Sequence, residues 1–199
     1  LPNCGNMGLP ICLFAYGKLG MGIASAISAV IIISHFTFGI FLASKKISFK
    51  VLLESTPVYA VIISVCLLYY EIEAPVFIEN TAFLLAYSTI AMILMSLGIA
   101  LTKLKVFAFK DAVISTFARL ILGPLVGLSI IYLFDLKGFA AGVLFIQTSM
   151  PSAILTYLVG SMYSSKKVAN GIASTIVVST IASFLTIPII VFIALKYFI

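Results

Sequence analysis

Long apolar stretches alternate with short polar ones along the whole chain. A helix needs about 20 mostly apolar residues to cross the hydrocarbon core of a bilayer. By that measure the pattern predicts membrane-spanning elements at residues 20–43, 51–70, 80–101, 112–134, 138–162 and 168–195. Residues 1–17 are rich in Gly, Pro and Asn before they turn apolar, which predicts the second half of a broken helix. We therefore expect an all-α membrane protein, a bundle of about six transmembrane elements.

The polar stretches predict how this bundle is oriented. Short cytoplasmic loops of membrane proteins carry an excess of Lys and Arg. Three loops on one side of the predicted bundle hold eight lysines: 44–50, 103–110 and 164–167. The other side holds three lysines and most of the acids, with an acidic loop at 71–80. We expect a multi-pass protein of the plasma membrane whose lysine-rich loops are cytoplasmic and whose C-terminus lies outside.

Composition supports the membrane assignment and excludes several functions. Hydrophobic residues make up 63% of the 199 residues and charged residues 9%, and the mean hydropathy is +1.27; a soluble domain carries about 25% charged residues. The net charge of +6 collects at span ends and not on a continuous basic face, so a nucleic-acid partner is rejected. The three cysteines lack metal-ligand spacing, and we expect no metal and no cofactor.

Two segments far apart in the chain resemble each other. Each places a proline in an apolar stretch interrupted by polar residues and continues to a Gly-Ile-Ala-Ser run that opens a long span: Pro10 with residues 22–25, and Pro151 with residues 171–174. The two proline-to-glycine spacings differ by eight residues. The segments lie five predicted spans apart, and because five is odd, the second copy is inverted in the membrane. Inverted repeats with interrupted helices in matching positions point to a transporter binding site.

The chemistry of a broken membrane helix explains that association. A proline lacks an amide hydrogen and clashes with the preceding turn, and each backbone group left unpaired in lipid costs several kcal/mol. The break is therefore tolerated only against protein or a watery cavity. Two such helices crossing at mid-membrane present half-helix ends to a ligand. Their N-termini carry roughly half a positive charge each, which suits an anionic substrate.

The residues around both prolines resemble the auxin efflux carrier family. Residues 3–10 (Asn-Cys-Gly-Asn-Met-Gly-Leu-Pro) resemble its N-x-G-N-x-G-L-P signature, and residues 147–153 resemble its second crossover helix. Arg119, followed by Gly-Pro-Leu at 123–125, resembles its eighth helix. The resemblance runs over essentially the whole chain. It implies a ten-helix inverted-repeat transporter with two proline-broken crossover helices, similar to the bile-acid/sodium symporters.

The resemblance also implies how the chain is divided. Residues 1–48 would be the end of the first repeat, comprising half of crossover helix four and helix five. Residues 49–199 would be the second repeat, helices six to ten, with its crossover near 147–152. Because the chain begins with Leu1 and not with Met, we expect three further helices and the start of the fourth upstream.

The broken helices and the resemblance together select the candidate site residues. We predict substrate-binding roles for Asn3 and Asn6, whose amides both donate and accept hydrogen bonds, and for a polar set around the second break: Gln147, Thr148, Ser149 and Ser152. Structural roles in shaping the crossover are predicted for four small or cyclic residues: Gly5, Gly8, Pro10 and Pro151. The alternative for the polar side chains is that they only cap the broken backbone.

Arg119 is the most informative charge within a predicted span. It lies nine residues beyond Lys110, about 14 Å into a hydrocarbon core of about 30 Å. A charge there should face the bundle interior, where it either attracts the anionic substrate or makes an internal pair. Glu54 is interpreted as an i,i+4 partner of Lys50, and His35 as a packed side chain.

The leading hypothesis is a permease for a small organic anion, such as an auxin-like or dicarboxylic acid, working by alternating access. It implies the anion, lipid and H⁺ or Na⁺ as partners, and leaves a homodimer open. The first alternative is a sodium-coupled organic-anion symporter of the bile-acid type, although no acid lies near either break. The second is a non-transporting membrane receptor. With one histidine and no acid at mid-membrane, an enzyme is not expected.

Overall fold

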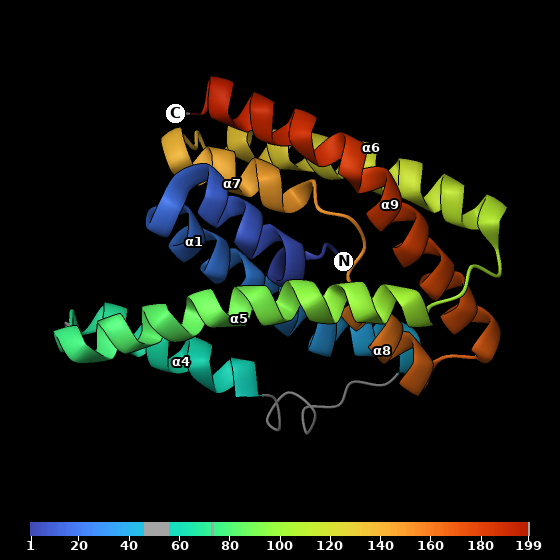
Figure 1. The fold of residues 1–199 in the computed structure, drawn as a ribbon, viewed down its shortest axis with the longest axis horizontal. Helices are drawn as coiled ribbons and strands as arrows, with labels where there is room; N and C mark the ends of the chain where they lie inside the picture. The colour runs from blue at the N-terminus through green and yellow to red at the C-terminus, as the bar shows by residue number, and fades with distance from the viewer. Residues whose placement is uncertain (46–55, 73, 199) are drawn as a thin grey trace.

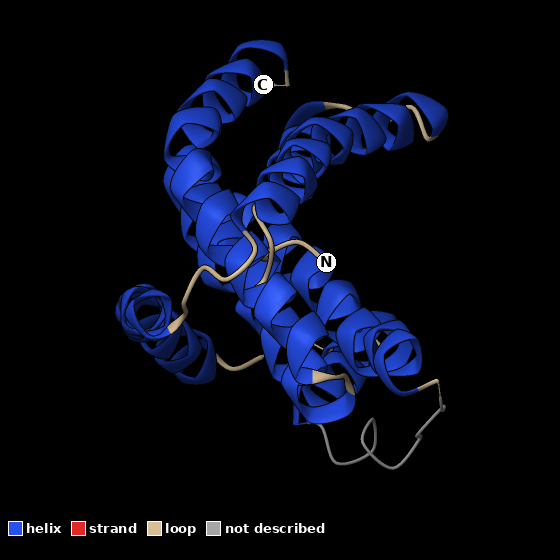
Figure 2. Ribbon diagram, turned by 90° about the vertical axis from the view of Figure 1, so that its right-hand side faces the viewer, coloured by secondary structure: helices blue, strands red, loops and turns tan. Residues whose placement is uncertain are grey.

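The computed structural model describes residues 1–45, 56–72 and 74–198, which are helical except for short connections. This part of the chain contains no strand (Figure 2). The predicted class, an all-α membrane protein, is confirmed. Most of the predicted basic loop at 44–50, the predicted boundary at 48–49 and Glu54 lie outside the described residues.

The helices follow the predicted elements closely. In chain order the described elements are the π-helix η1 (Cys4–Gly8), α1 (Leu9–Ser34), the π-helix η2 (His35–Gly39), α2 (Ile40–Ser44), α4 (Thr56–Tyr69), α5 (Val76–Lys103), α6 (Phe109–Leu133), α7 (Gly138–Thr148), α8 (Ile154–Tyr163) and α9 (Lys166–Tyr197). Four described stretches are long and apolar enough to cross a membrane: Cys4–Ser44, Val76–Lys103, Phe109–Leu133 and Lys166–Tyr197. The element predicted at 138–162 is interrupted around Pro151, as expected, and forms the shorter apolar helices α7 and α8.

Gly17 divides α1 into two helical segments. Its φ of 64° and ψ of −153° lie in a region that only glycine adopts readily. Residues 9–16 therefore complete the broken helix, and the next span starts at residue 18, close to the predicted start at residue 20. Gly20 lets the second segment lie against the first, because a Cβ there would overlap the side chain of Tyr16.

The polar loops on either side of α5 are shorter than predicted. α5 begins directly after Pro75, so Glu79 lies in its first turn and not in the predicted acidic loop at 71–80. The helix dipole favours a carboxylate in the first turn, which is why this acid does not mark a loop. Lys110 likewise lies in the first turn of α6, outside the loop that was expected to extend over 103–110.

α7 lies at the centre of the bundle. It packs on α1, α6 and α9, while α6 and α9 run against each other, and α8 packs on α9, η2 and α2 (Figure 1). The buried core gathers around α7 and includes these residues: Cys12, Ala141, Val143, Ile146 and Met150. On the far side of α1, α5 contacts η1 and α4 contacts α1 (Figure 1). Outward-facing side chains are apolar, for example Leu185, which is 77% exposed, as expected for a surface in lipid.

Candidate functional site

The two breaks in the helices lie against each other at the centre of the molecule. The backbone between α7 and α8 is extended, and it pairs antiparallel with the extended residues that precede η1. The amide of Asn3 donates to the carbonyl oxygen of Pro151 at 2.8 Å, and the amide of Ala153 donates to that of Leu1 at 3.1 Å. Each break therefore satisfies part of the unpaired backbone of the other, which lipid could not do.

This pairing brings Pro2, a proline of the first segment other than Pro10, beside the break at Pro151. Pro2 pairs with the residue that follows Pro151, whereas Pro10 is the second residue of α1. Pro2 and Pro151 are 149 residues apart, and so are the Gly-Ile-Ala-Ser runs at 22–25 and 171–174. Matching Pro2 in place of Pro10 with Pro151 removes the difference of eight residues between the two proline-to-glycine spacings.

Arg119 covers the carbonyl groups that the second break leaves unpaired. Its Nη2 donates to the carbonyl oxygen of Thr148 at 2.9 Å, and its Nε donates to that of Met150 at 3.2 Å. A positive charge is also favourable at the C-terminus of α7. Gly123 and Gly127 of α6 allow this approach, because a Cβ on either residue would overlap the carbonyl oxygen or the hydroxyl of Thr148.

The polar side chains predicted around the second break point mostly into protein. Gln147 is fully buried and donates from Nε2 to the carbonyl oxygen of Ala24 at 3.3 Å. The hydroxyls of Thr148 and Ser149 donate to carbonyl oxygens one turn back in α7, at 2.9 and 2.6 Å. Ser152, in contrast, lines a cavity of about 330 Å³ between α6, α8 and α9, which we call the Asp111 cavity after its acidic residue.

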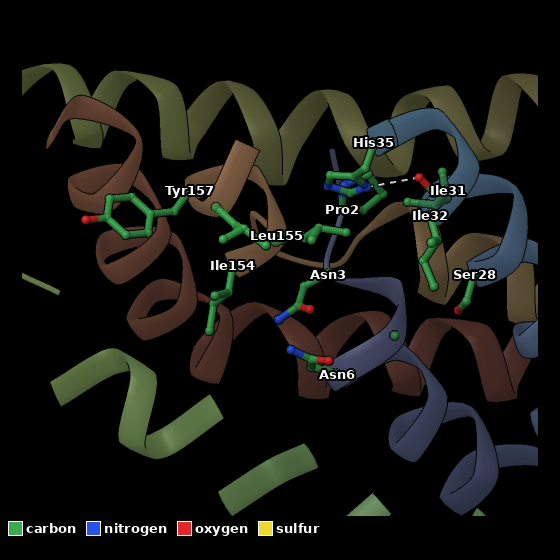
Figure 3. A pocket seen from close by; sticks show the side chains of 13 residues that line it. Pro2, Asn3, Asn6, Ser28, Ile31, Ile32, His35, Ile154, Leu155 and Tyr157 are labelled. Carbon is green, nitrogen blue, oxygen red and sulfur yellow. Dashed lines mark hydrogen bonds between the residues drawn. The ribbon is translucent and has the colours of Figure 1, made fainter. Parts of the chain in front are cut away.

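Asn3 and Asn6 border a different and larger cavity. This crossing cavity, about 420 Å³ in volume, lies between the first break with η1, the second segment of α1 with the start of η2, and the first turns of α8. Most of its side chains are apolar, and five lining residues carry polar or ionisable side-chain groups: Asn3, Asn6, Ser28, His35 and Tyr157. Figure 3 shows the two asparagines between the start of α8 and the side of the cavity that carries Ser28 of α1 and His35 of η2.

Two polar atoms on the wall of the crossing cavity lack a hydrogen-bond partner. They are Nδ2 of Asn3, a residue only 3% exposed, and Oγ of Ser28, also 3% exposed. A buried polar group without a partner costs about 1–3 kcal/mol. Groups of this kind therefore gain most from a ligand that enters the cavity and bonds to them.

His35 was interpreted as a packed side chain, and it is buried, but it also lines the crossing cavity. Its Nδ1 lies 2.9 Å from the carbonyl oxygen of Ile31, and its Nε2 lies 3.3 Å from Oγ1 of Thr156. Ser28 and His35 line the candidate site although the sequence did not select them, and Thr156 joins it only through its contact with His35. The available signal was the rarity of an ionisable side chain within a membrane span.

The crossing cavity is suited to an anion. None of its lining residues in the described part of the chain is Asp or Glu. α8 begins at its wall without a side-chain cap, so the N-terminal amides and the positive end of the helix dipole face that region. The amide of Asn3 adds a donor without a partner. Gly5, Gly8 and Pro10, predicted to shape the crossover, lie in or directly after η1.

Comparisons with known proteins identify the family. Residues 40–192 match the family described as "Membrane transport protein". The chain is 27% identical over 199 residues to an uncharacterized transporter, MJ1031, of Methanocaldococcus jannaschii, and the alignment covers 95% of this chain and 64% of that protein. No solved structure matches. The chain therefore belongs to the membrane transport protein family, the auxin efflux carrier-like family that its motifs resemble.

Proposed function

We propose that this permease moves a small organic anion across the plasma membrane by alternating access, and that the anion binds in the crossing cavity. The observation that carries the proposal is that Asn3, whose buried side-chain nitrogen has no hydrogen-bond partner, lines a cavity without acidic side chains beside the start of α8. A carboxylate placed there would accept a hydrogen bond from Asn3 and lie at the positive end of a helix dipole. The second break, capped by Arg119, would fix the geometry.

The proposal also includes an architecture of two inverted repeats and their orientation in the membrane. The constant offset of 149 residues between the two segments supports two inverted repeats, the first ending with α2 and the second beginning before α4. In such transporters, rocking of one bundle against another exposes a central site to each side in turn. The lysine-rich loops would be cytoplasmic and the C-terminus outside. The chain spans 64% of the relative that it matches, and a transporter of that length would supply further walls to the site.

The test uses the full-length protein in proteoliposomes on a capacitive membrane sensor. A panel of mono- and dicarboxylates is added with a sodium gradient, a proton gradient or neither. We expect a substrate-dependent current that Asn6→Ala and Pro151→Ala abolish, and the gradient that enhances the current identifies the coupling ion. A current that requires sodium would favour the symporter alternative. Carboxylate binding without current or counterflow, in protein shown to be folded, would favour a receptor.

A further inference from the structure

Three cavities meet at the hydrogen bond between His35 and Thr156. The third is the Phe38 cavity, about 270 Å³ in volume, which lies between η2, α2, α8 and the start of α9 and is lined by Phe38, Leu42 and Val159 among others. His35 lines both the crossing cavity and the Phe38 cavity, and Thr156 lines both the Phe38 cavity and the Asp111 cavity. The pair therefore forms part of the wall that separates the three spaces.

The Phe38 cavity lies between the crossing and one end of the bundle. Its lining continues to Ala43 and Ser164, which adjoin the lysine-rich loops at 44–50 and 164–167. These two residues also touch, because the hydroxyl of Ser164 donates to the carbonyl oxygen of Ala43 at 3.5 Å. His35 belongs to the wall that the crossing cavity shares with the Phe38 cavity, on the side toward that end of the bundle.

The geometry fixes which atom donates in this pair. A carbonyl oxygen only accepts, so the neutral imidazole of His35 carries its proton on Nδ1, which donates to Ile31 at 2.9 Å. Nε2 is then an acceptor, and the hydroxyl of Thr156 donates to it at 3.3 Å. If the pair separates, the Thr156 hydroxyl becomes a free donor at the junction of the cavities.

The backbone at this point departs from regular helix. His35 is the first residue of η2, and η1, the other π-helix in the described residues, carries Gly5 and Asn6 on the opposite wall of the crossing cavity. Short π-helical turns are rare and occur frequently at functional sites. Both irregular turns thus border the same space, one at the anion site and one at the His35–Thr156 pair.

We propose that His35 and Thr156 form a polar gate between the crossing cavity and the Phe38 cavity. The inference rests on the proposed function for the identity of the solute. In the closed state the Thr156 hydroxyl donates to Nε2 of His35. In the open state it donates instead to the carboxylate of the passing anion, so that Thr156 serves as a second, transient binding position on the path.

The gate is tested by cysteine accessibility in the full-length protein, which requires no knowledge of the substrate. Ser28→Cys places a thiol on the wall of the crossing cavity, and protein without this substitution gives the background. A membrane-impermeant maleimide is applied to membrane vesicles from the side that bears the loops around residues 45 and 166. We expect slow labelling in the reporter protein. Labelling should become about tenfold faster when Thr156→Val, which keeps the shape and removes the hydroxyl, is added.

Two further variants isolate the hydrogen bond. His35→Asn keeps an amide near the Nδ1 position and loses Nε2, so it should accelerate labelling as Thr156→Val does, whereas Thr156→Ser keeps the hydroxyl and should label slowly. Thr37→Val is the matched control, because the Thr37 hydroxyl donates to the carbonyl oxygen of Ile33 in its own helix. It should leave the rate unchanged. Equal rates for Thr156→Val and Thr37→Val would overturn the gate.

Transport separates failure of the gate from failure of the proposed function. If the carboxylate panel gives current and labelling does not respond to Thr156→Val, the permease stands and the gate is wrong. If labelling responds and no carboxylate is transported, the gate stands and the proposed substrate class is wrong. If both hold, Thr156→Val should slow carboxylate counterflow at saturating substrate more than Thr156→Ser does, because it lacks the transient donor.

Discussion

At the second break, between α7 and α8, Arg119 donates to two carbonyl oxygens and nearby hydroxyls turn back onto their own helix. At the first break, before η1, Asn3 lines a cavity, and its buried side-chain nitrogen has no hydrogen-bond partner. The two segments share an extended backbone with a proline, and each completes the hydrogen bonding of the other. They differ in what their side chains do.

That difference assigns separate tasks to the two halves of the crossing. A break whose side-chain donors are mostly paired inside protein gains little from an anion, whereas a break with an unpaired buried donor gains a hydrogen bond when one binds. We infer that the second break is the fixed support and the first the binding face. Substitutions at the second break should mainly affect stability, and substitutions at the first should mainly affect affinity.

The largest effect is expected at Arg119. Arg119→Ala leaves the carbonyl oxygens of Thr148 and Met150 without their donor, at a cost of about 2–6 kcal/mol for the two groups together. Thermal unfolding of the purified protein in detergent, followed by circular dichroism, should show a clear drop in midpoint. Arg119→Lys cannot span both oxygens as the planar guanidinium does. Its thermal midpoint should lie between those of the unsubstituted protein and Arg119→Ala. A variant that stays fully stable but loses carboxylate binding would make Arg119 a substrate ligand instead.

The contact between α6 and the end of α7 gives the next largest effect. Gly123→Ala places a methyl group where it overlaps the carbonyl oxygen of Thr148, and overpacking of this kind costs about 1–3 kcal/mol. Gly98→Ala in α5 is the matched control, since its Cβ would meet nothing within 4 Å and should be neutral or slightly stabilising. The measurement is the thermal midpoint of each variant. Equal midpoints for Gly123→Ala and Gly98→Ala would mean that α6 does not approach the second break this closely.

A smaller effect, on affinity and not on stability, is expected at Asn3. Asn3→Ala removes an amide nitrogen that has no protein partner, so the free energy of unfolding should change by less than about 1 kcal/mol. Carboxylate affinity, measured by concentration dependence of the transport current, should fall about tenfold, the equivalent of ~1.4 kcal/mol. Comparable losses of stability at Asn3 and Arg119 would remove the distinction between the two breaks.

The elements of the fold could be predicted because lipid allows so few backbone arrangements. Apolar length places the spans, and proline with glycine marks the interruption near Pro151 and the break before residue 17. The backbone pairing of Pro2 with Ser152 could not be predicted, since it joins residues far apart in the chain. Asn3 could be selected from its residue type. Whether a polar side chain such as that of His35 lines a cavity depends on helix rotation and packing, and composition does not report these.

The smallest effect is expected at Gln147. For this residue the two interpretations of the second break, as part of the substrate site or as a structural support, give different predictions. The sequence places it among the substrate-binding residues, yet it is fully buried, packs against Gly8 and makes one long bond from Nε2, while Oε1 has no partner. Gln147→Met keeps the volume, loses that bond and removes the unpaired oxygen. These changes nearly offset each other, so stability should shift by less than about 1 kcal/mol and transport affinity should be retained. A tenfold loss of affinity at unchanged stability would instead show that the side chain reaches the anion in another conformation of the cycle, and the second break would then share the binding face with the first.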